Sequence, residues 1–335
     1  MISVYSVTHF LVDFACAFLM FRSISGTPDW YLCVLLYNFC AFAMQMPLGI
    51  LADKWSRNYL FAAIGCGLVG AAYGLWQFPA EAAIAAGIGN GMFHIGGGID
   101  VLNVSEEKSG ALGVFVSPGA FGIYFGTILG KGRGLTGIPI LLALLAAIGA
   151  IFAVRRAQGG ACVKNAAFSL NGWTSPRMLT AAACLFFVVC LRAYVSLTLS
   201  FPWKSAGCWG VVLVCAVVFG KTAGGLASDR FGLAKTACMS SGLAALLFLI
   251  PHIPAAGVLS MLLFNMTMPV TLWVMAKILP GAKGFSFGLL TFGLFLGFLP
   301  AYSGVSASSD APWLFTLAAA VSFALLFVSL RKAGP

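Results

Sequence analysis

Long apolar segments make up almost the whole chain, and each is long enough to cross a lipid bilayer. Of the 335 residues, 61% are hydrophobic and 8% are charged, against roughly 25% charged in soluble domains. A spanning helix needs about 20 mostly apolar residues. On that basis we expect twelve helices, at residues 2–21, 30–52, 58–78, 81–104, 109–130, 135–154, 177–200, 206–227, 233–251, 254–277, 284–304 and 311–330. The segments are too long for barrel strands and do not alternate, so the expected fold class is an all-α integral membrane protein.

The Lys and Arg residues predict the orientation of these helices. Most of them fall in loops on one side of the expected membrane, and such an excess marks the cytoplasmic side. We therefore expect a multi-pass protein of the inner or plasma membrane with both termini in the cytoplasm. The same distribution accounts for the net charge of +10 without a nucleic-acid partner, because the basic residues are spread over many loops.

A short pattern occurs twice, half a chain apart, between long apolar segments. Its members lie at a constant offset of 176 residues: Gly49 and Gly225, Asp53 and Asp229, Gln45 and Lys221. Two asparagines, Asn90 and Asn265, repeat at an offset of 175. A membrane protein whose halves repeat in this way is most simply a transporter, because two similar bundles rocking about a central site give alternating access.

The longest polar loop divides the chain near its middle. It is basic and rich in glycine, and it runs from about residue 155 to 176. We therefore expect an N-terminal six-helix bundle at 1–155, a cytoplasmic linker at 156–176 and a C-terminal six-helix bundle at 177–335.

These features resemble the major facilitator superfamily. Its signature between the second and third helices is matched by Gly49, Asp53, Lys54 and Arg57, and its second copy by Gly225, Asp229 and Arg230. The stretch 117–122 loosely resembles the glycine–proline motif of antiporter members, although its glycine spacing differs. The stretches 9–13 and 91–94 resemble the fosmidomycin-resistance group of exporters. The resemblance implies two pseudo-symmetric six-helix bundles, with the first helix of each half lining a central cavity.

The repeated signature predicts a gate on the cytoplasmic side. Gly49 and Gly225 permit the close approach of a neighbouring helix. Asp53 lies at a helix end, where its carboxylate can meet the N-terminus of another helix or pair with Arg57. Asp100 is a further candidate for this network. The alternative is that these residues only anchor the loop in the headgroup region.

Two charges fall deep inside expected spans, where each costs roughly 2.5–3.5 kcal/mol on insertion scales. Asp13 is placed to carry a proton, and Arg192 to bind an anionic group of the substrate. The alternative is a fixed Asp13–Arg192 bridge between the halves.

Other polar residues within the spans are candidates for the substrate and proton site. His9 shares a helix face with Asp13, and Asn90 shares one with His94, since each pair is four residues apart. We expect a structural role for His9, which lies nearer the cytoplasmic surface, and leave His94 open between the site and the core. Lys221 either faces the cavity or extends to the interface. Gln45 and Asn265 complete the set.

These observations predict a secondary active transporter, a proton-coupled exporter of small organic compounds or drugs, some of them anionic. No nucleotide-binding motif or nucleophile–base set is present, so we expect neither ATP use nor an enzyme. The scattered cysteines indicate packing rather than a metal site, and no cofactor is expected. The expected partners are the small-molecule substrate, protons and the lipid bilayer, with the protein a monomer. The alternatives are a proton- or sodium-coupled importer of an organic anion and a non-transporting receptor or scramblase.

Overall fold

The computed structural model describes residues 1–105, 108–132, 134–159, 165–171, 175–304 and 312–334, and within these ranges every regular element is helical. Ten helices of this part of the chain, taken with their direct continuations, are long and apolar enough to cross a membrane. The chain is thus an integral multi-pass membrane protein. Two further helices are not among the ten. One is α11 (Leu233–Leu247), with 15 residues; the other is α5 (Pro79–Val104), whose hydropathy is lowered by Asn90, His94 and a run of glycines.

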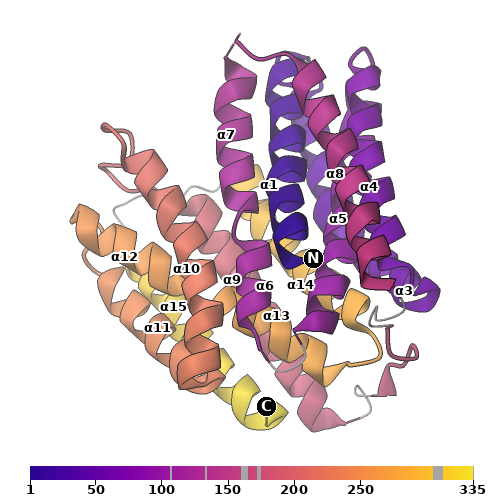
Figure 1. Ribbon diagram of the computed structural model, residues 1–335. Coiled ribbons are helices and arrows are strands. Elements are labelled where there is room, and N and C mark those ends of the chain that lie inside the picture. Colours follow the sequence, from indigo (N-terminus) through magenta and orange to yellow (C-terminus); the bar gives the residue numbers. More distant parts are fainter. Residues whose placement is uncertain (106–107, 133, 160–164, 172–174, 305–311, 335) are drawn as a thin grey trace. The chain divides into compact units, whose positions relative to one another are not determined.

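The helices form two compact units, and the first unit comprises Met1–Glu106, Pro118–Phe168 and Gly281–Gly288. Its helices are α1 (Ile2–Leu19), α2 (Trp30–Asn38), α3 (Gln45–Trp55), α4 (Asn58–Ala72), α5, α7 (Gly119–Lys131) and α8 (Gly137–Gln158), together with the start of α14 (Lys283–Tyr302). α7 lies along α1, and α4 along α5 (Figure 1).

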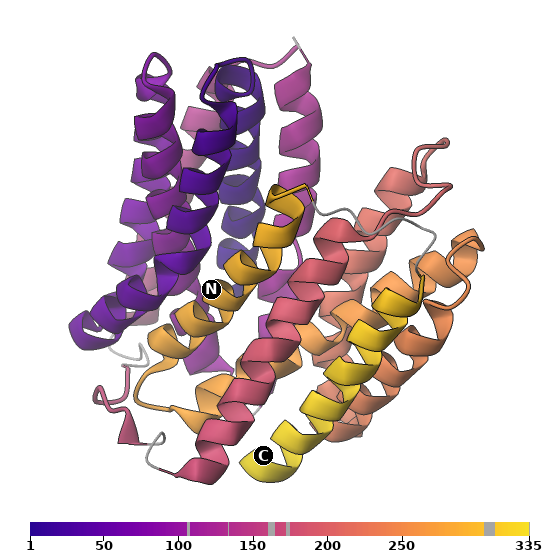
Figure 2. The same ribbon diagram turned by 180° about the vertical axis from the view of Figure 1, so that it is seen from behind.

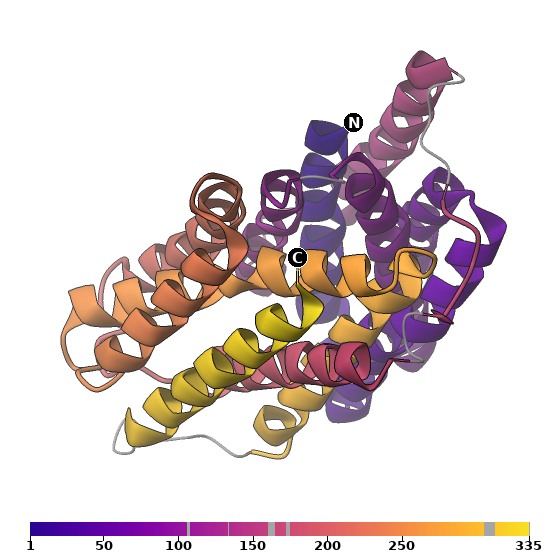
Figure 3. The same cartoon turned by 90° about the horizontal axis from the view of Figure 1, so that it is seen from below.

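The second unit comprises Glu107–Ser117, Ser169–Pro280 and Leu289–Pro335. Its helices are α6 (Gly110–Val116), α9 (Pro176–Thr198), α10 (Trp209–Phe231), α11, α12 (Pro254–Asn265), α13 (Thr267–Ile278), the remainder of α14 and α15 (Pro312–Ala333). α15 runs beside α9 (Figures 2 and 3), and the Arg177 side chain at the start of α9 donates to the Lys332 carbonyl oxygen, 2.6 Å away. Phe248, Phe264 and Phe315 are fully buried in the core of this unit.

Three of the expected spans are interrupted, and none of the interruptions was predicted. The segment expected at 30–52 contains a π-helical turn, Phe39–Ala43, between α2 and α3. The segment expected at 109–130 breaks at Ser117 and Pro118, because proline has no N–H for the helical ladder. The segment expected at 254–277 changes from α12 to α13 at Met266.

Glycines set the helix spacing in the first unit. Gly122, Gly126 and Gly130 of α7 face α1, and a Cβ at any of them would collide with α1 backbone oxygen atoms. This stripe lets the two backbones touch. It also fixes the start of α7 against the middle of α1.

The expected linker at 156–176 is described only in part, since residues 160–164 and 172–174 lie outside the described residues. The contact-based units follow the two halves of the sequence except in two short segments, 107–117 and 281–288, which each group with the opposite half. The expected division of the sequence into an N-terminal bundle at 1–155 and a C-terminal bundle at 177–335 stays a prediction.

Candidate functional site

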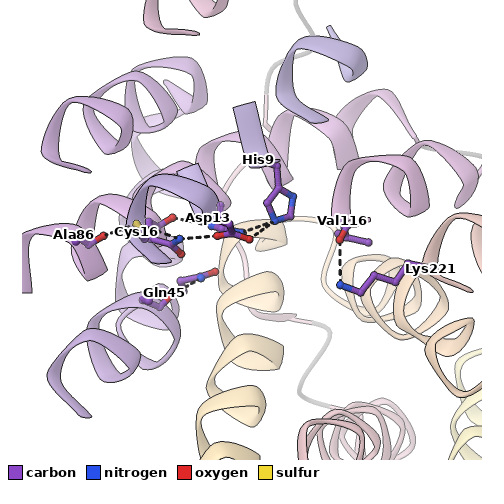
Figure 4. A network of polar contacts seen from close by, with 10 residues as sticks. His9, Asp13, Cys16, Gln45, Ala86, Val116 and Lys221 are labelled. Carbon is purple, nitrogen blue, oxygen red and sulfur yellow. Dashed lines mark hydrogen bonds and ion pairs between the residues drawn. The ribbon is translucent and has the colours of Figure 1, made fainter. Parts of the chain in front are cut away.

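Asp13 lies at the centre of a buried polar cluster in the first unit. Its Oδ1 accepts a hydrogen bond of 2.8 Å from Asn90 Nδ2 and lies 3.8 Å from His94 Nε2. Its Oδ2 lies 3.2 Å from His9 Nε2 (Figure 4). All four side chains are buried. The two pairs expected on single helix faces, one on α1 and one on α5, therefore meet in one cluster.

The two histidines of this cluster also touch each other. His9 Nε2 and His94 Nε2 are 2.8 Å apart, and His94 Nδ1 lies 2.9 Å from the Asn90 carbonyl oxygen. A carbonyl only accepts, so His94 Nδ1 carries a hydrogen, and in a neutral His94 the Nε2 atom presents its lone pair to His9. The hydrogen between the two rings is then on His9 Nε2, which also faces the Asp13 carboxylate.

The start of α7 closes over this cluster. A Cβ at Gly119 would collide with Asp13 Oδ2 and with the His9 ring, so the backbone of α7 lies directly against both groups. Because α7 begins at Gly119, after the break at Pro118, its N-terminus lies beside the Asp13 carboxylate. The partial positive charge of a helix N-terminus favours a nearby carboxylate.

The sequence assigned different roles to the four members of this cluster. It placed Asp13 and Asn90 at the site and left His94 open between the site and the core. It expected a structural role for His9, whose role stays a prediction; His9 is 5% exposed and contacts both Asp13 and His94. The available signal was the shared four-residue spacing of the two pairs. No spacing along the chain shows that two such faces meet.

Arg192 of α9 lies buried in the second unit. Its Nη1 donates to the hydroxyl oxygens of Thr267 and Thr271, each at 3.4 Å, and these threonines lie one turn apart on α13. Among the described residues of this unit, no carboxylate is within ion-pair distance of Arg192. Arg192 is 5% exposed, and in the described part of the chain its guanidinium makes two long hydrogen bonds to neutral hydroxyl groups. Asp13 and Arg192 belong to different units, and the prediction that they face one cavity stays a prediction.

The remaining polar candidates differ in their surroundings. Gln45 is fully buried and donates to the Ala41 carbonyl oxygen of its own segment. Asn265 donates to the Met261 carbonyl oxygen, 2.8 Å away on its own helix. Lys221 of α10 directs its ammonium group to the Val116 carbonyl oxygen at the end of α6, 3.3 Å away (Figure 4). We expected Lys221 either to face the cavity or to extend to the membrane interface, and neither expectation included a contact with the end of α6.

Asp53 caps the start of α14. Its Oδ1 accepts the Gly284 N–H at 2.8 Å, and its Oδ2 accepts the Phe285 N–H at 2.9 Å. These amides belong to the first turn of α14 and have no partner within that helix. A Cβ at Gly49 would collide with the Gly284 backbone, so α3 and α14 touch here. Of the two expected partners for Asp53, the structure provides a helix N-terminus.

Asp229 makes the corresponding contact in the second unit. Its Oδ1 accepts the Ser109 N–H at 2.7 Å, and its Oδ2 accepts the Gly110 N–H at 2.9 Å, at the start of α6. A Cβ at Gly225 would lie 2.8 Å from the Ser109 carbonyl oxygen. In both copies of the signature, a glycine thus lets a helix start approach closely, and the aspartate four residues later caps it.

Three other members of the expected gate lie outside these caps. Arg57 is exposed at the start of α4, and Arg230 is exposed with its guanidinium over the Phe231 ring. Asp100 accepts hydrogen bonds from the Tyr5 hydroxyl, at 2.6 Å, and from Asn58 Nδ2, at 2.8 Å. Asp100 thus connects α1, α4 and α5.

Solved transporter structures share this architecture across nearly the whole chain. The Escherichia coli fucose:proton symporter matches with a TM-score of 0.65 and 14% identity, covering 97% of each chain. A bacterial homologue of the iron transporter ferroportin, in an outward-facing state, matches with a TM-score of 0.68 and 12% identity over 100% of each chain. The chain has the major facilitator fold.

No protein-family model and no curated protein matches the sequence. At these identities the likeness to major facilitator transporters concerns the fold alone. The resemblance to the fosmidomycin-resistance group rests only on the two short stretches 9–13 and 91–94, and membership of that group stays a prediction.

Proposed function

We propose that the protein is a secondary active transporter of the major facilitator type, a proton-coupled exporter of small organic compounds, organic anions in particular. It works as a monomer with twelve membrane-spanning segments in two pseudo-symmetric bundles and both termini in the cytoplasm. Substrate and coupling proton shift the populations of the inward-open and outward-open states by their differential affinities.

The buried guanidinium of Arg192 carries the proposal. A permanent charge inside a membrane protein is costly without compensation. The contacts of Arg192 with Thr267 and Thr271, at 3.4 Å, supply no negative charge. A carboxylate or similar group of a substrate compensates the charge and uses several of the five N–H donors. The two threonine hydroxyls donate to the backbone carbonyl oxygens of Phe264 and Met268, each at 2.8 Å, so the donors for such a ligand come from the guanidinium.

The Asp13 cluster supplies the place for the coupling proton. It holds a carboxylate between two imidazoles, with one hydrogen shared by His9 Nε2 and His94 Nε2 at 2.8 Å. A buried group that gains and loses a proton as the cavity opens to one side couples transport to the proton gradient.

The two helix caps supply the gate. Asp53 and Asp229 each accept two backbone hydrogen bonds from the start of another helix. Bonds to a charged acceptor are worth about 1.5–3 kcal/mol each. Such caps stabilise a state in which the cytoplasmic side is closed, and they are broken when that side opens.

The test is a thermal-shift screen of the purified protein against small organic anions and matched neutral compounds. A ligand at 100 times its Kd stabilises the folded state by about 2.7 kcal/mol. Anions should raise the unfolding temperature of the wild type but not of the Arg192→Gln variant. Hits are then followed in proteoliposomes with an imposed pH gradient. Counterflow in vesicles of known orientation distinguishes export from import, and the absence of any proton-dependent flux would indicate the receptor or scramblase alternative.

A further inference from the structure

His9, Asp13 and His94 form a set of metal-ligand atoms that goes beyond the proposed transport function. The three residues can each offer one ligand atom, and these atoms lie within 4.8 Å of one another. We propose that this cluster binds one divalent first-row transition metal ion, with the two imidazole Nε2 atoms and the Asp13 carboxylate as ligands. The hydrogen that now lies between the two Nε2 atoms moves to His9 Nδ1 when the ion binds, so that both Nε2 atoms present lone pairs to it. The sequence did not predict this metal site, because residue spacing along the chain does not show that α1 and α5 lie against each other.

The distances between the ligand atoms suit such an ion. In a tetrahedral zinc site the ligand atoms lie about 2.1 Å from the metal, which places them roughly 3.4 Å from each other. The pairs observed here are separated by 2.8 Å between the two Nε2 atoms, by 3.2 Å from His9 Nε2 to Oδ2, and by 3.8 Å from His94 Nε2 to Oδ1. Movements of about half an ångström would open the position for an ion.

The orientation of His94 is the one that a metal ligand needs. Its Nδ1 lies 2.9 Å from the Asn90 carbonyl oxygen, which holds the proton on Nδ1 and directs the Nε2 lone pair into the cluster. Metal-bound histidines almost always have such a second hydrogen bond, which fixes their tautomer. Two imidazoles with a carboxylate are ligands that suit zinc, iron and nickel rather than calcium or magnesium.

A buried amide beside the cluster can supply a further oxygen ligand. Asn90 is 1% exposed, and its Oδ1 has no hydrogen-bond partner in the described part of the chain. Leaving a buried acceptor unsatisfied is costly. A half-turn of the amide exchanges Oδ1 with Nδ2, the atom that now faces Asp13 Oδ1 at 2.8 Å. The carbonyl oxygen then becomes the fourth ligand, or accepts a hydrogen bond from a metal-bound water, and the bound ion replaces the hydrogen bond that Nδ2 donates to Asp13.

The experiment is a titration of the purified full-length chain in detergent with ZnCl₂, followed by isothermal calorimetry. Exposed Cys208 is replaced by serine throughout, so that its thiol does not bind zinc. We expect one site in this background, and an affinity at least about tenfold lower in Asp13→Asn and His94→Gln. The matched control is His252→Gln, because His252 is exposed in a turn of the second unit, and its affinity should be unchanged.

Two further measurements keep the test decisive if a variant folds poorly. Asn90→Asp adds a carboxylate beside the same position and should raise the affinity by about tenfold, which loss of fold would not produce. With Co²⁺ as the probe, the visible spectrum should show nitrogen and oxygen ligation rather than thiolate bands. No stoichiometric binding, a thiolate spectrum, or unchanged affinity in Asp13→Asn and His94→Gln would overturn the metal site. None of these results depends on flux, so the transport proposal stands or fails separately.

Discussion

Replacing Asp53 by asparagine should release the start of α14 by a calculable amount. The carboxylate accepts the Gly284 and Phe285 amides at 2.8 and 2.9 Å, one on each oxygen. Asparagine keeps one acceptor oxygen and turns an NH₂ group towards the other amide, so one charge-assisted bond is lost. That bond is worth about 1.5–3 kcal/mol, which is roughly a 10- to 150-fold change in an equilibrium constant.

Hydrogen exchange measures this change directly at the two amides. In Asp53→Asn, a peptide covering 281–290 should exchange roughly 10 to 150 times faster at Gly284 and Phe285, while the core of α5 stays protected. The matched control is Asp29→Asn, the same substitution at an exposed aspartate without a side-chain cap. Equal protection at 284 and 285 in wild type and Asp53→Asn, with normal yield, would refute the capping argument. In proteoliposomes the variant should fold but turn over more slowly, because the closed state that the cap stabilises is depleted.

Three further substitutions test the candidate sites. Asp13→Asn should abolish proton-driven flux and leave substrate exchange, because exchange need not discharge the proton; equal loss of both would contradict the coupling role. Arg192→Gln should weaken the binding of anionic ligands by roughly 10- to 150-fold, since a charged hydrogen bond is worth about 1.5–3 kcal/mol, and leave neutral ligands unaffected in the same thermal-shift assay. Gly119→Ala should lower stability by about 1–3 kcal/mol, because its Cβ meets Asp13 and His9. Gly149→Ala, with nothing within 4 Å of its Cβ, should be neutral or raise the unfolding temperature slightly.

The sequence predicted the positions of most helices because each span carries its own apolar signal. The segment expected at 135–154 corresponds to α8, Gly137–Gln158, and the segment expected at 177–200 is α9, Pro176–Thr198. The interruptions at Phe39–Ala43 and Met266 carry no comparable signal, whereas a proline within an apolar segment is itself a signal for a break. The π-helical turn at Phe39–Ala43 is as apolar as its surroundings, and Pro118 was noted as part of a motif rather than as a break.

The candidate sites were predictable only as far as local spacing reaches. The four-residue spacing placed His9 with Asp13 and Asn90 with His94, but the contact between the two histidines joins residues 85 positions apart. A helix N-terminus was predicted as one partner of Asp53, without the means to say which helix. That partner lies 231 residues away, and the packing of the first residues of α14 against α3, including Gly49 against Gly284, brings the two together.

The Asp53 cap also has a consequence for biosynthesis. The ribosome makes α3 early, but the amides that Asp53 binds are synthesised 231 residues later. At about 5–20 residues per second, this interval lasts roughly 10–45 s. Throughout that time the Asp53 carboxylate has no helix N-terminus to cap, and Gly49 has no α14 packed against it. A truncated chain ending before residue 281 would lack this cap permanently, so the N-terminal half alone never reaches the packing that the full chain has at α3.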